Sequence, residues 1–244
     1  MEQKVSFSSC QEPIVWPSEK CVALITGANK GIGFEVARQL GRKGILVLVG
    51  SRDLVKGSMA MEKLKIENIF AQLMEIDVTN QQTIDRAVAR VEKEYGHLDI
   101  LINNAAVQHE GEAPSETKME KLHQTFEANF FGVFSVTKAF IPLLQKSPNG
   151  ARIINVSSQL GSFGNHIKGR NKLAYSCSKA ALNMMTYQFA KEFQDKRMRI
   201  TINSVDPGMS KPSARWRKRC KGMSESMENV PRLQRSLSIT GEGD

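Results

Sequence analysis

Two side chains four residues apart, Tyr175 and Lys179, are the first candidates for chemistry in this chain. A spacing of four places both side chains on one face of a helix, about one turn apart. A phenol with a pKa of about 10 is a poor acid or base at neutral pH unless a neighbouring positive charge favours its ionised form, and a lysine supplies that charge. The spacing therefore predicts an acid–base pair, although on its own it is also typical of an ordinary surface pair.

A glycine-rich turn is the second candidate. Gly27, Gly31 and Gly33 follow the apolar run 21–26 and open a helix-like stretch. In such a turn, backbone N–H groups and the positive end of the helix face one point, where they can hold a pyrophosphate. The first glycine permits the tight turn, the second lets the backbone approach the phosphates, and the third lets the helix pack on the strand. By itself the cluster is equally compatible with an ordinary strand-to-helix turn.

Both candidates need a rigid scaffold, and the chain alternates short apolar runs with helix-like stretches, as a parallel sheet with crossover helices does. The predicted strands cover 21–26, 45–50, 70–76, 98–102, 152–156 and 199–205. The predicted helices cover 32–43, 53–66, 80–95, 116–145 and 175–195. We therefore expect an α/β fold: a Rossmann-type, doubly wound parallel sheet in a single domain.

Composition limits the classes of protein that this chain can be. With 244 residues, 41% of them hydrophobic, it can bury one sizeable core. Cys10, Cys21, Cys177 and Cys220 match neither a zinc site nor a disulfide framework, which favours a reducing compartment. No apolar run approaches the roughly 20 residues of a membrane helix, and residues 1–19 lack the apolar stretch of a secretory signal. We expect a soluble, cytoplasmic protein that has no membrane partner and no metal.

The net charge of +9 is partly due to the end of the chain. The last 34 residues hold eight Lys and Arg against four Asp and Glu, so +4 of the total belongs to them. The basic segment 215–221 is the main argument for nucleic-acid binding. Because no nucleic-acid fold motif accompanies it, we interpret the segment as solvated and do not expect a nucleic-acid partner.

The candidates belong to a longer series of motifs. In chain order these are Thr26-Gly27-Ala28-Asn29-Lys30-Gly31-Ile32-Gly33, Asn103-Asn104-Ala105-Ala106, Asn129, Ser157-Ser158, Tyr175-Ser176-Cys177-Ser178-Lys179 and Asp206-Pro207-Gly208. At these spacings, residues 20–210 resemble the short-chain dehydrogenase/reductase family. The segments 27–35 and 51–53 are most similar to NADPH-dependent carbonyl reductases and to menthone and salutaridine reductases. The resemblance implies hydride transfer between a nicotinamide nucleotide and a small-molecule carbonyl or alcohol substrate, and it leaves open whether the protein is a monomer or a homo-oligomer.

The resemblance also implies a role for each matching residue. Tyr175 gives its proton to the substrate oxygen, and Ser158 orients that oxygen. Lys179 bonds the nicotinamide ribose, and Asn129 supports a proton-relay water. Residues 77–78 match the position that bonds the adenine. The full set of residues that match the family's cofactor site is Gly27, Asn29, Lys30, Gly31, Ile32, Gly33, Arg52, Asp77, Val78, Asn104, Ala105, Tyr175, Lys179, Pro207 and Gly208.

The end of the second predicted strand bears on the choice of cofactor. An acidic side chain there would bond the ribose 2′-hydroxyl and repel a 2′-phosphate. Aligned with the family, Ser51 takes that position, Arg52 follows it, and Lys30 lies just before the second glycine of the turn. The two cations favour a phosphate through charge-assisted hydrogen bonds, which predicts NADPH. Asp53 can either reach the ribose or cap the next helix, and capping is the simpler interpretation.

The resemblance weakens in three places. Ala106 stands where the family has glycine, and Ser158 and Tyr175 are seventeen residues apart, further than usual. The extra residues fall in the loop 161–173, which we expect to form one wall of the substrate cleft. Pro212 stands where the family has the threonine that holds the nicotinamide carboxamide.

We expect three segments in chain order: an N-terminal extension (1–19), the domain (20–210) and a disordered basic tail (211–244). In the family, the stretch that corresponds to 211–244 supplies the last strand of the sheet. The tail does not match it, so the prediction allows for a sheet without that strand. Two functions remain open at this point. The first is reduction of a ketone or aldehyde with NADPH; the second is a catalytically impaired nucleotide-binding variant that acts through protein partners.

Overall fold

The computed structural model describes residues 21–109, 113–162 and 172–208. The extension 1–19, the tail 211–244 with Pro212, and most of the predicted cleft loop lie outside the described residues.

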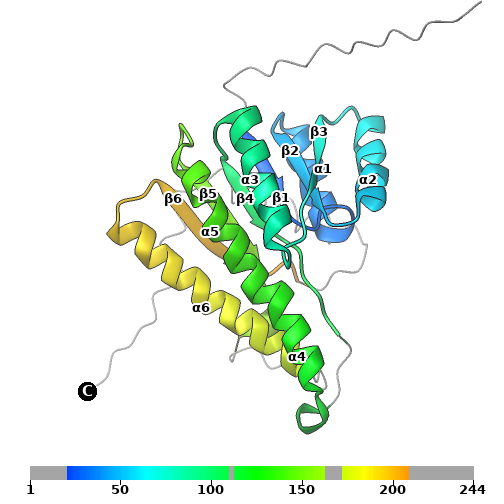
Figure 1. The fold of residues 1–244 in the computed structure, drawn as a ribbon, viewed down its shortest axis with the longest axis vertical. Helices are drawn as coiled ribbons and strands as arrows, with labels where there is room; N and C mark the ends of the chain where they lie inside the picture. Colours follow the sequence, from blue (N-terminus) through cyan, green and yellow to red (C-terminus); the bar gives the residue numbers. More distant parts are fainter. Residues whose placement is uncertain (1–20, 110–112, 163–171, 209–244) are drawn as a thin grey trace, which may run out of the picture.

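A single parallel sheet forms the centre of the molecule (Figure 1). Its strands are β1 (Val22–Ile25), β2 (Leu46–Ser51), β3 (Ala71–Glu75), β4 (Ile100–Asn103), β5 (Ala151–Val156) and β6 (Ile200–Val205). They lie in the order β3-β2-β1-β4-β5-β6, and every neighbouring pair is parallel. The order reverses between β1 and β4, which is where doubly wound sheets open a crevice for ligands. The predicted Rossmann-type fold is confirmed, and within the described ranges no strand pairs with the outer side of β6.

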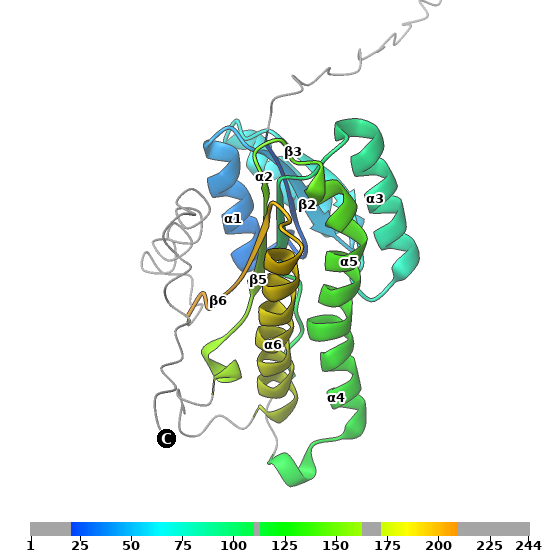
Figure 2. The same cartoon turned by 90° about the vertical axis from the view of Figure 1, so that its left-hand side faces the viewer.

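Helices cover both faces of the sheet (Figure 2). They are α1 (Gly31–Arg42), α2 (Leu54–Ile66), α3 (Gln81–Tyr95), α4 (Met119–Phe126), α5 (Gly132–Gln145) and α6 (Leu173–Asp195). Successive side chains of a strand point to opposite faces. Accordingly, Ala23 and Ile25 pack with α1 and α2, whereas Val22 and Leu24 pack with α3, α5 and α6. The sheet is therefore buried on both faces, as its Val-, Ile- and Leu-rich strands predict.

The predicted helix 116–145 forms from Met119 to Gln145 and contains a π-helical turn. A 3-10 turn at Pro114–Glu116 precedes α4, and a π-helical turn at Glu127–Phe131 separates α4 from α5. Single π-helical turns occur frequently at functional sites. This one contains Asn129, one of the residues to which the family resemblance gives a role.

A chain of hydrogen-bonded polar side chains, all buried except Ser204, ties the carboxyl ends of three strands to two helices. Asn103 Nδ2 donates to Thr137 Oγ1 at 3.0 Å and to Asn155 Oδ1 at 2.9 Å. Asn155 Nδ2 and Ser204 Oγ both donate to Thr186 Oγ1, at 2.8 and 2.9 Å. Buried polar groups are costly unless paired, so these bonds favour one arrangement of β4, β5 and β6 against α5 and α6.

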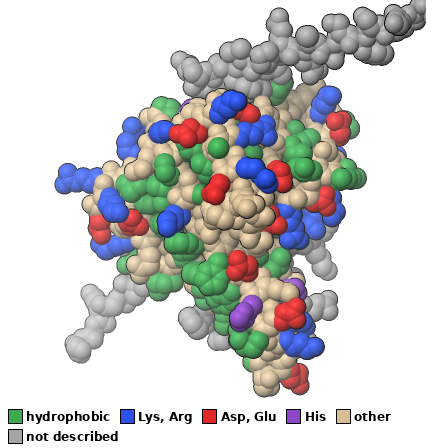
Figure 3. Space-filling view, viewed as in Figure 1, with side chains coloured by type: hydrophobic (Ala, Val, Ile, Leu, Met, Phe, Trp, Pro, Cys, Tyr) green, Lys and Arg blue, Asp and Glu red, His purple; other side chains and the backbone are tan. Residues whose placement is uncertain are grey.

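Charged side chains of both signs are interspersed on the face shown in Figure 3. Ion pairs on the surface include Arg42–Glu67 at 2.6 Å and Lys146–Glu92 at 2.8 Å. This face does not carry the extended basic patch that is typical of nucleic-acid binding. None of the described helices has the length and apolar character needed to cross a membrane.

Candidate active site

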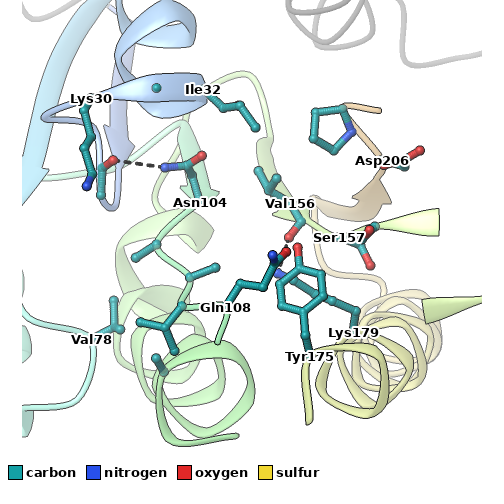
Figure 4. Close-up of a pocket in the computed structure, with 18 of the residues that line it drawn as sticks. Lys30, Ile32, Val78, Asn104, Gln108, Val156, Ser157, Tyr175, Lys179 and Asp206 are labelled. Carbon is teal, nitrogen blue, oxygen red and sulfur yellow. Dashed lines mark hydrogen bonds between the residues drawn. The ribbon is translucent and has the colours of Figure 1, made fainter. Parts of the chain in front are cut away.

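A cleft of about 980 Å³ opens at the carboxyl edge of the sheet, beyond the ends of β1, β4 and β5 (Figure 4). Most of the predicted site residues line it: Gly27, Asn29, Lys30, Gly31, Ile32, Arg52, Asp77, Val78, Asn104, Ala105, Ser158, Tyr175, Lys179, Pro207 and Gly208. Two predicted residues, Gly33 and Asn129, lie behind its wall. The fold thus brings the glycine turn and the Tyr175–Lys179 pair, which are far apart in the sequence, to one cavity.

The turn between β1 and α1 has the conformation that a phosphate site needs. Gly27 and Gly31 have φ angles of 64° and 62°, the left-handed region that favours glycine. A Cβ atom at Gly27 would lie 2.9 Å from the Cα atom of Ala105. Lys30, the residue before α1, makes no side-chain cap. The N-terminus of α1 therefore faces the cleft with its positive end available to an anion.

A clamp of hydrogen bonds joins this turn to the segment after β4. Thr26 Oγ1 accepts from the backbone N–H groups of Asn104 and Ala105, each at 3.0 Å. Asn104 Nδ2 donates to the carbonyl oxygens of Thr26 at 2.9 Å and Gly27 at 3.1 Å. Gly33 packs directly behind, where a Cβ atom would come within 2.5 Å of Asn104 Nδ2. The same Cβ atom would lie 2.9 Å from the Ala28 Cα atom and from the Gly27 carbonyl oxygen, so Gly33 packs against the turn and Asn104, whereas the sequence predicts packing on the strand.

At the far end of the cleft, Lys30 and Arg52 are exposed and line the cavity. Asp53 does not compete for a ligand there, because it is the N-cap of α2. Its side chain accepts from Lys56 N at 3.0 Å and pairs with Lys56 Nζ at 2.6 Å, and the hydrogen bonds from Lys56 lower the pKa of its carboxyl group. Ser51 Oγ donates to the Asp53 carbonyl at 2.8 Å. The capping interpretation of Asp53 is confirmed.

Tyr175 and Lys179 lie on the cleft side of α6, as their spacing predicts (Figure 4). Lys179 Nζ lies 5.6 Å from the centroid of the Tyr175 ring and donates to the carbonyl oxygen of Val156 at 2.7 Å. Lys179 is 2% exposed, and this burial lowers its pKa to about 8. The lysine is thus held by β5 beneath the phenol ring rather than at the hydroxyl group.

The pKa of Tyr175 differs from the sequence-based expectation. Burial raises the pKa of this phenol, its hydrogen bond with the Ser158 side chain lowers it, and the charge of Asp206 raises it. Burial has the largest effect, so the pKa is raised, whereas the sequence predicts that Lys179 lowers it. In the unliganded protein Tyr175 is therefore held in its protonated form, which is the form that donates a proton.

Asn129 is fully buried and takes no direct part in the cleft. Its Oδ1 accepts from Val107 N at 2.8 Å, and its Nδ2 donates to Val107 O at 2.9 Å and Ser178 Oγ at 3.1 Å. Ser178 Oγ in turn donates to the Tyr175 carbonyl at 2.8 Å. Both amide hydrogens are thus used within the protein, and Asn129 ties the segment after β4 to α6. Its support of a proton-relay water stays a prediction.

Several lining residues have no role in the sequence-based prediction. Gln108 points toward Tyr175 from the segment after β4, and Asp206 lies on the β6 side of the cleft (Figure 4). Lys172 lines the cleft at the start of α6. Thr26 and Asp206 fall inside motifs of the series, but neither residue type indicates its function without the fold. In the described part of the chain, no group of three or more His, Cys, Asp or Glu side chains can hold a metal ion.

Comparisons with known proteins bear on this site. The family model of the short chain dehydrogenases matches residues 21–221. A short-chain dehydrogenase/reductase of Aspergillus fumigatus is 34% identical over 213 residues, which is 80% of this chain and 80% of that protein. NADPH carbonyl reductase 1 of Mus musculus is 40% identical over 147 residues, 59% of this chain and 50% of that protein. A crystal structure of an actinorhodin polyketide ketoreductase variant with NADPH aligns with a TM-score of 0.72 and 32% identity, over 80% of this chain and 72% of that one.

Proposed function

Because this chain belongs to the short-chain dehydrogenase family of oxidoreductases, we propose that it reduces a ketone or an aldehyde to an alcohol by hydride transfer from NADPH. The observation that carries the proposal is the shared cleft, which holds a phosphate-type turn at one end and a protonated Tyr175 beside Ser158 at the other. The similarity to a carbonyl reductase named for NADPH, and to a ketoreductase solved with NADPH, supports both the reaction and the cofactor.

The residues present fit a dinucleotide. The glycine turn and the N-terminus of α1 would hold the pyrophosphate, because Gly27 and Gly31 line the cleft and a Cβ atom at Gly31 would stand in open space, with no atom within 4 Å. Lys30 and Arg52 would bond a 2′-phosphate, and Asp77 with Val78 would line the adenine end. A bound NADPH supplies hydride to the substrate's carbonyl carbon.

The protein's own residues supply the proton. The Tyr175 hydroxyl gives its proton to the carbonyl oxygen as the hydride arrives at carbon, so the C=O bond becomes CH–OH. Ser158, whose side chain forms a hydrogen bond with that of Tyr175, would donate to the same oxygen. Lys179, 5.6 Å from the ring centroid, stabilises the phenolate left behind until solvent returns a proton.

A substrate screen tests this function. Aldehydes, ketones and quinones are added to the full chain with NADPH, and loss of the NADPH absorbance is followed. Turnover that disappears in Tyr175→Phe would support the proposal. NADPH binding without consumption across the whole screen would favour the alternative, a nucleotide-binding variant without catalysis.

Cofactor preference gives a separate prediction. NADPH should bind about tenfold more tightly than NADH, a difference of about 1.4 kcal/mol that two charge contacts readily supply. Arg52→Asp should reverse the preference, because it replaces a cation with a group that repels phosphate and bonds a ribose hydroxyl. Fluorescence titration with both nucleotides measures the ratio.

The control for this experiment is Asp53→Asn. It removes a charge next to Arg52 but keeps a side chain that caps α2, so the NADPH-to-NADH ratio should stay as in the parent. Equal affinities of the parent chain for the two nucleotides would contradict the assignment of Lys30 and Arg52.

We also propose a cytoplasmic setting for this reaction. Cys21 and Cys177, the cysteines in the described part of the chain, are both unpaired, as in a reducing compartment. Fluorescence imaging of the tagged full chain tests the location. A signal in the medium or inside a membrane-bound compartment would contradict the proposal.

A further inference from the structure

The turn that carries Ser158 is fastened to α6 by a side chain that the mechanism above does not use. Asn183 lies on α6 four residues after Lys179, so Tyr175, Lys179 and Asn183 follow one another along one face of the helix. Asn183 is half-buried and lies outside the lining of the cleft. Any part that it takes in the reaction is therefore exerted through its neighbours.

On the N-terminal side of Ser158, the end of β5 is bonded twice to this face of α6. Val156 O accepts from Lys179 Nζ at 2.7 Å, and Ser157 Oγ donates to Asn183 Oδ1 at 2.7 Å. Ser157 is 5% exposed, so its hydroxyl group has little access to water and would be left unpaired without this acceptor. The bond to Asn183 thus fixes the residue next to Ser158.

On the C-terminal side of Ser158, the 3-10 turn Gln159–Gly161 rests on the same helix. Asn183 Nδ2 donates to the Gly161 carbonyl oxygen at 3.3 Å. The approach is close, because a Cβ atom at Gly161 would lie 2.7 Å from the Lys179 carbonyl carbon. Within the turn, Gly161 N donates to Ser158 O at 2.9 Å. A displacement of the turn from α6 would therefore carry Ser158 with it.

We propose that Asn183 is a positioning residue that holds Ser158 against Tyr175. The inference rests on the proposed function, in which both hydroxyl groups act on one substrate oxygen. The amide of Asn183 reaches both ends of the segment that contains Ser158, since Oδ1 holds residue 157 and Nδ2 holds residue 161. Two hydroxyl groups can bond one oxygen only while the distance between them is kept, and a displacement of about 1 Å can cost about a hundredfold in rate.

Asn183→Leu removes both bonds and keeps a side chain of similar size. With the full chain, kcat for carbonyl reduction should fall by about ten- to a hundredfold, while the Kd for NADPH changes by less than about twofold. The same substitution is then made in a Ser158→Ala chain. There it should lower kcat by less than about twofold, because the hydroxyl group that it positions is already absent. Equal losses in the two backgrounds would show a general structural role and overturn the proposal.

Two further variants complete the kinetic test. Gln188→Leu on the same helix is the control, because Gln188 is exposed and lies outside the cleft lining, so kcat should stay as in the parent. Ser157→Ala deletes one oxygen atom and removes only the bond to Asn183 Oδ1. It should lower kcat by about three- to tenfold, again only while Ser158 is present, and it serves if Asn183→Leu does not fold.

Hydrogen exchange in the unliganded chain, followed by mass spectrometry, gives a readout that needs no turnover. The amides of segment 157–162 should exchange at least about tenfold faster in Asn183→Leu, whereas those of α5 exchange as in the parent. Faster exchange in a chain that turns over no carbonyl would retain the anchoring by Asn183 and reject the proposed reaction. Turnover together with unchanged exchange would reject the anchoring and leave the reaction in place.

Discussion

Replacing Tyr175 with Phe is expected to lower kcat for carbonyl reduction by roughly a hundred- to ten-thousandfold, the usual contribution of a positioned acid. The Kd for NADPH should change by less than about twofold, because the hydroxyl acts in the transition state whereas the ring only packs in the ground state. Phe also keeps the aromatic face over Lys179 Nζ. Steady-state kinetics and a nucleotide titration of the same preparation measure the two quantities.

Tyr187→Phe is the matched control. Tyr187 lies on the same helix and is 53% exposed, away from the lining of the cleft, so the identical chemical change should leave kcat unchanged. If Tyr175→Phe kept most of the parent's rate, another group would have to supply the proton.

Replacing Lys179 with Met is expected to remove turnover and, at the same time, to stabilise the unliganded protein by about 2 kcal/mol near neutral pH. Burial that lowers the pKa of this lysine from 10.5 to about 8 costs about 3 kcal/mol of folding free energy. Loss of the hydrogen bond to the Val156 carbonyl offsets about 1 kcal/mol of that gain. Met fills a similar volume without a charge. Chemical denaturation of the two proteins measures the difference.

The pH dependence of this difference has a definite sign. The folded-state pKa of Lys179 lies below the unfolded-state value, so between about pH 8 and 10.5 the unfolded chain binds more protons. The free energy of unfolding of the parent therefore rises with pH in that window through this group, and the advantage of Lys179→Met shrinks toward pH 10.5. Below pH 8 the advantage is at its full size.

Lys191→Met on the same helix is the control, because the Lys191 side chain is 58% exposed and forms a surface ion pair with Asp195 at 3.3 Å. It should change the free energy of unfolding by no more than about 0.5 kcal/mol. If the Lys179→Met protein had a lower free energy of unfolding than the parent at pH 7, the buried lysine would stabilise the fold, which contradicts this prediction.

The strands and most helices could be predicted from the sequence because their signals are local. Apolar runs and helical periodicity place β1 to β6, α1, α2, α3 and α6 to within a few residues. The predicted helix 116–145 forms as one run from Met119 to Gln145, but its π-helical turn could not be predicted. The π-helical turn within it accompanies the bonds of Asn129 to Val107, 22 residues away, and no local pattern contains that information.

For the candidate site too, the spacing of the residues could be predicted from the sequence, whereas the surroundings of their side chains could not. The glycine spacing and the Tyr175–Lys179 spacing are local, and the structure places those residues in the cleft. The environment of each side chain is not local. The pKa of Tyr175 depends on its burial, on its hydrogen bond with Ser158 and on the charge of Asp206 after β6. These depend on contacts between elements, which the order of residues does not reveal.

The close packing around Gly33 restricts the mutational routes open to this protein. A Cβ atom at position 33 would lie 2.5 Å from Asn104 Nδ2 and 2.9 Å from both the Ala28 Cα atom and the Gly27 carbonyl oxygen, so two of its three neighbours would be backbone atoms. Shortening Asn104 would therefore remove its bonds to the Thr26 and Gly27 carbonyls without making room for a side chain at position 33. In a library that randomises both positions, surviving sequences should keep glycine at position 33 whichever residue occupies position 104.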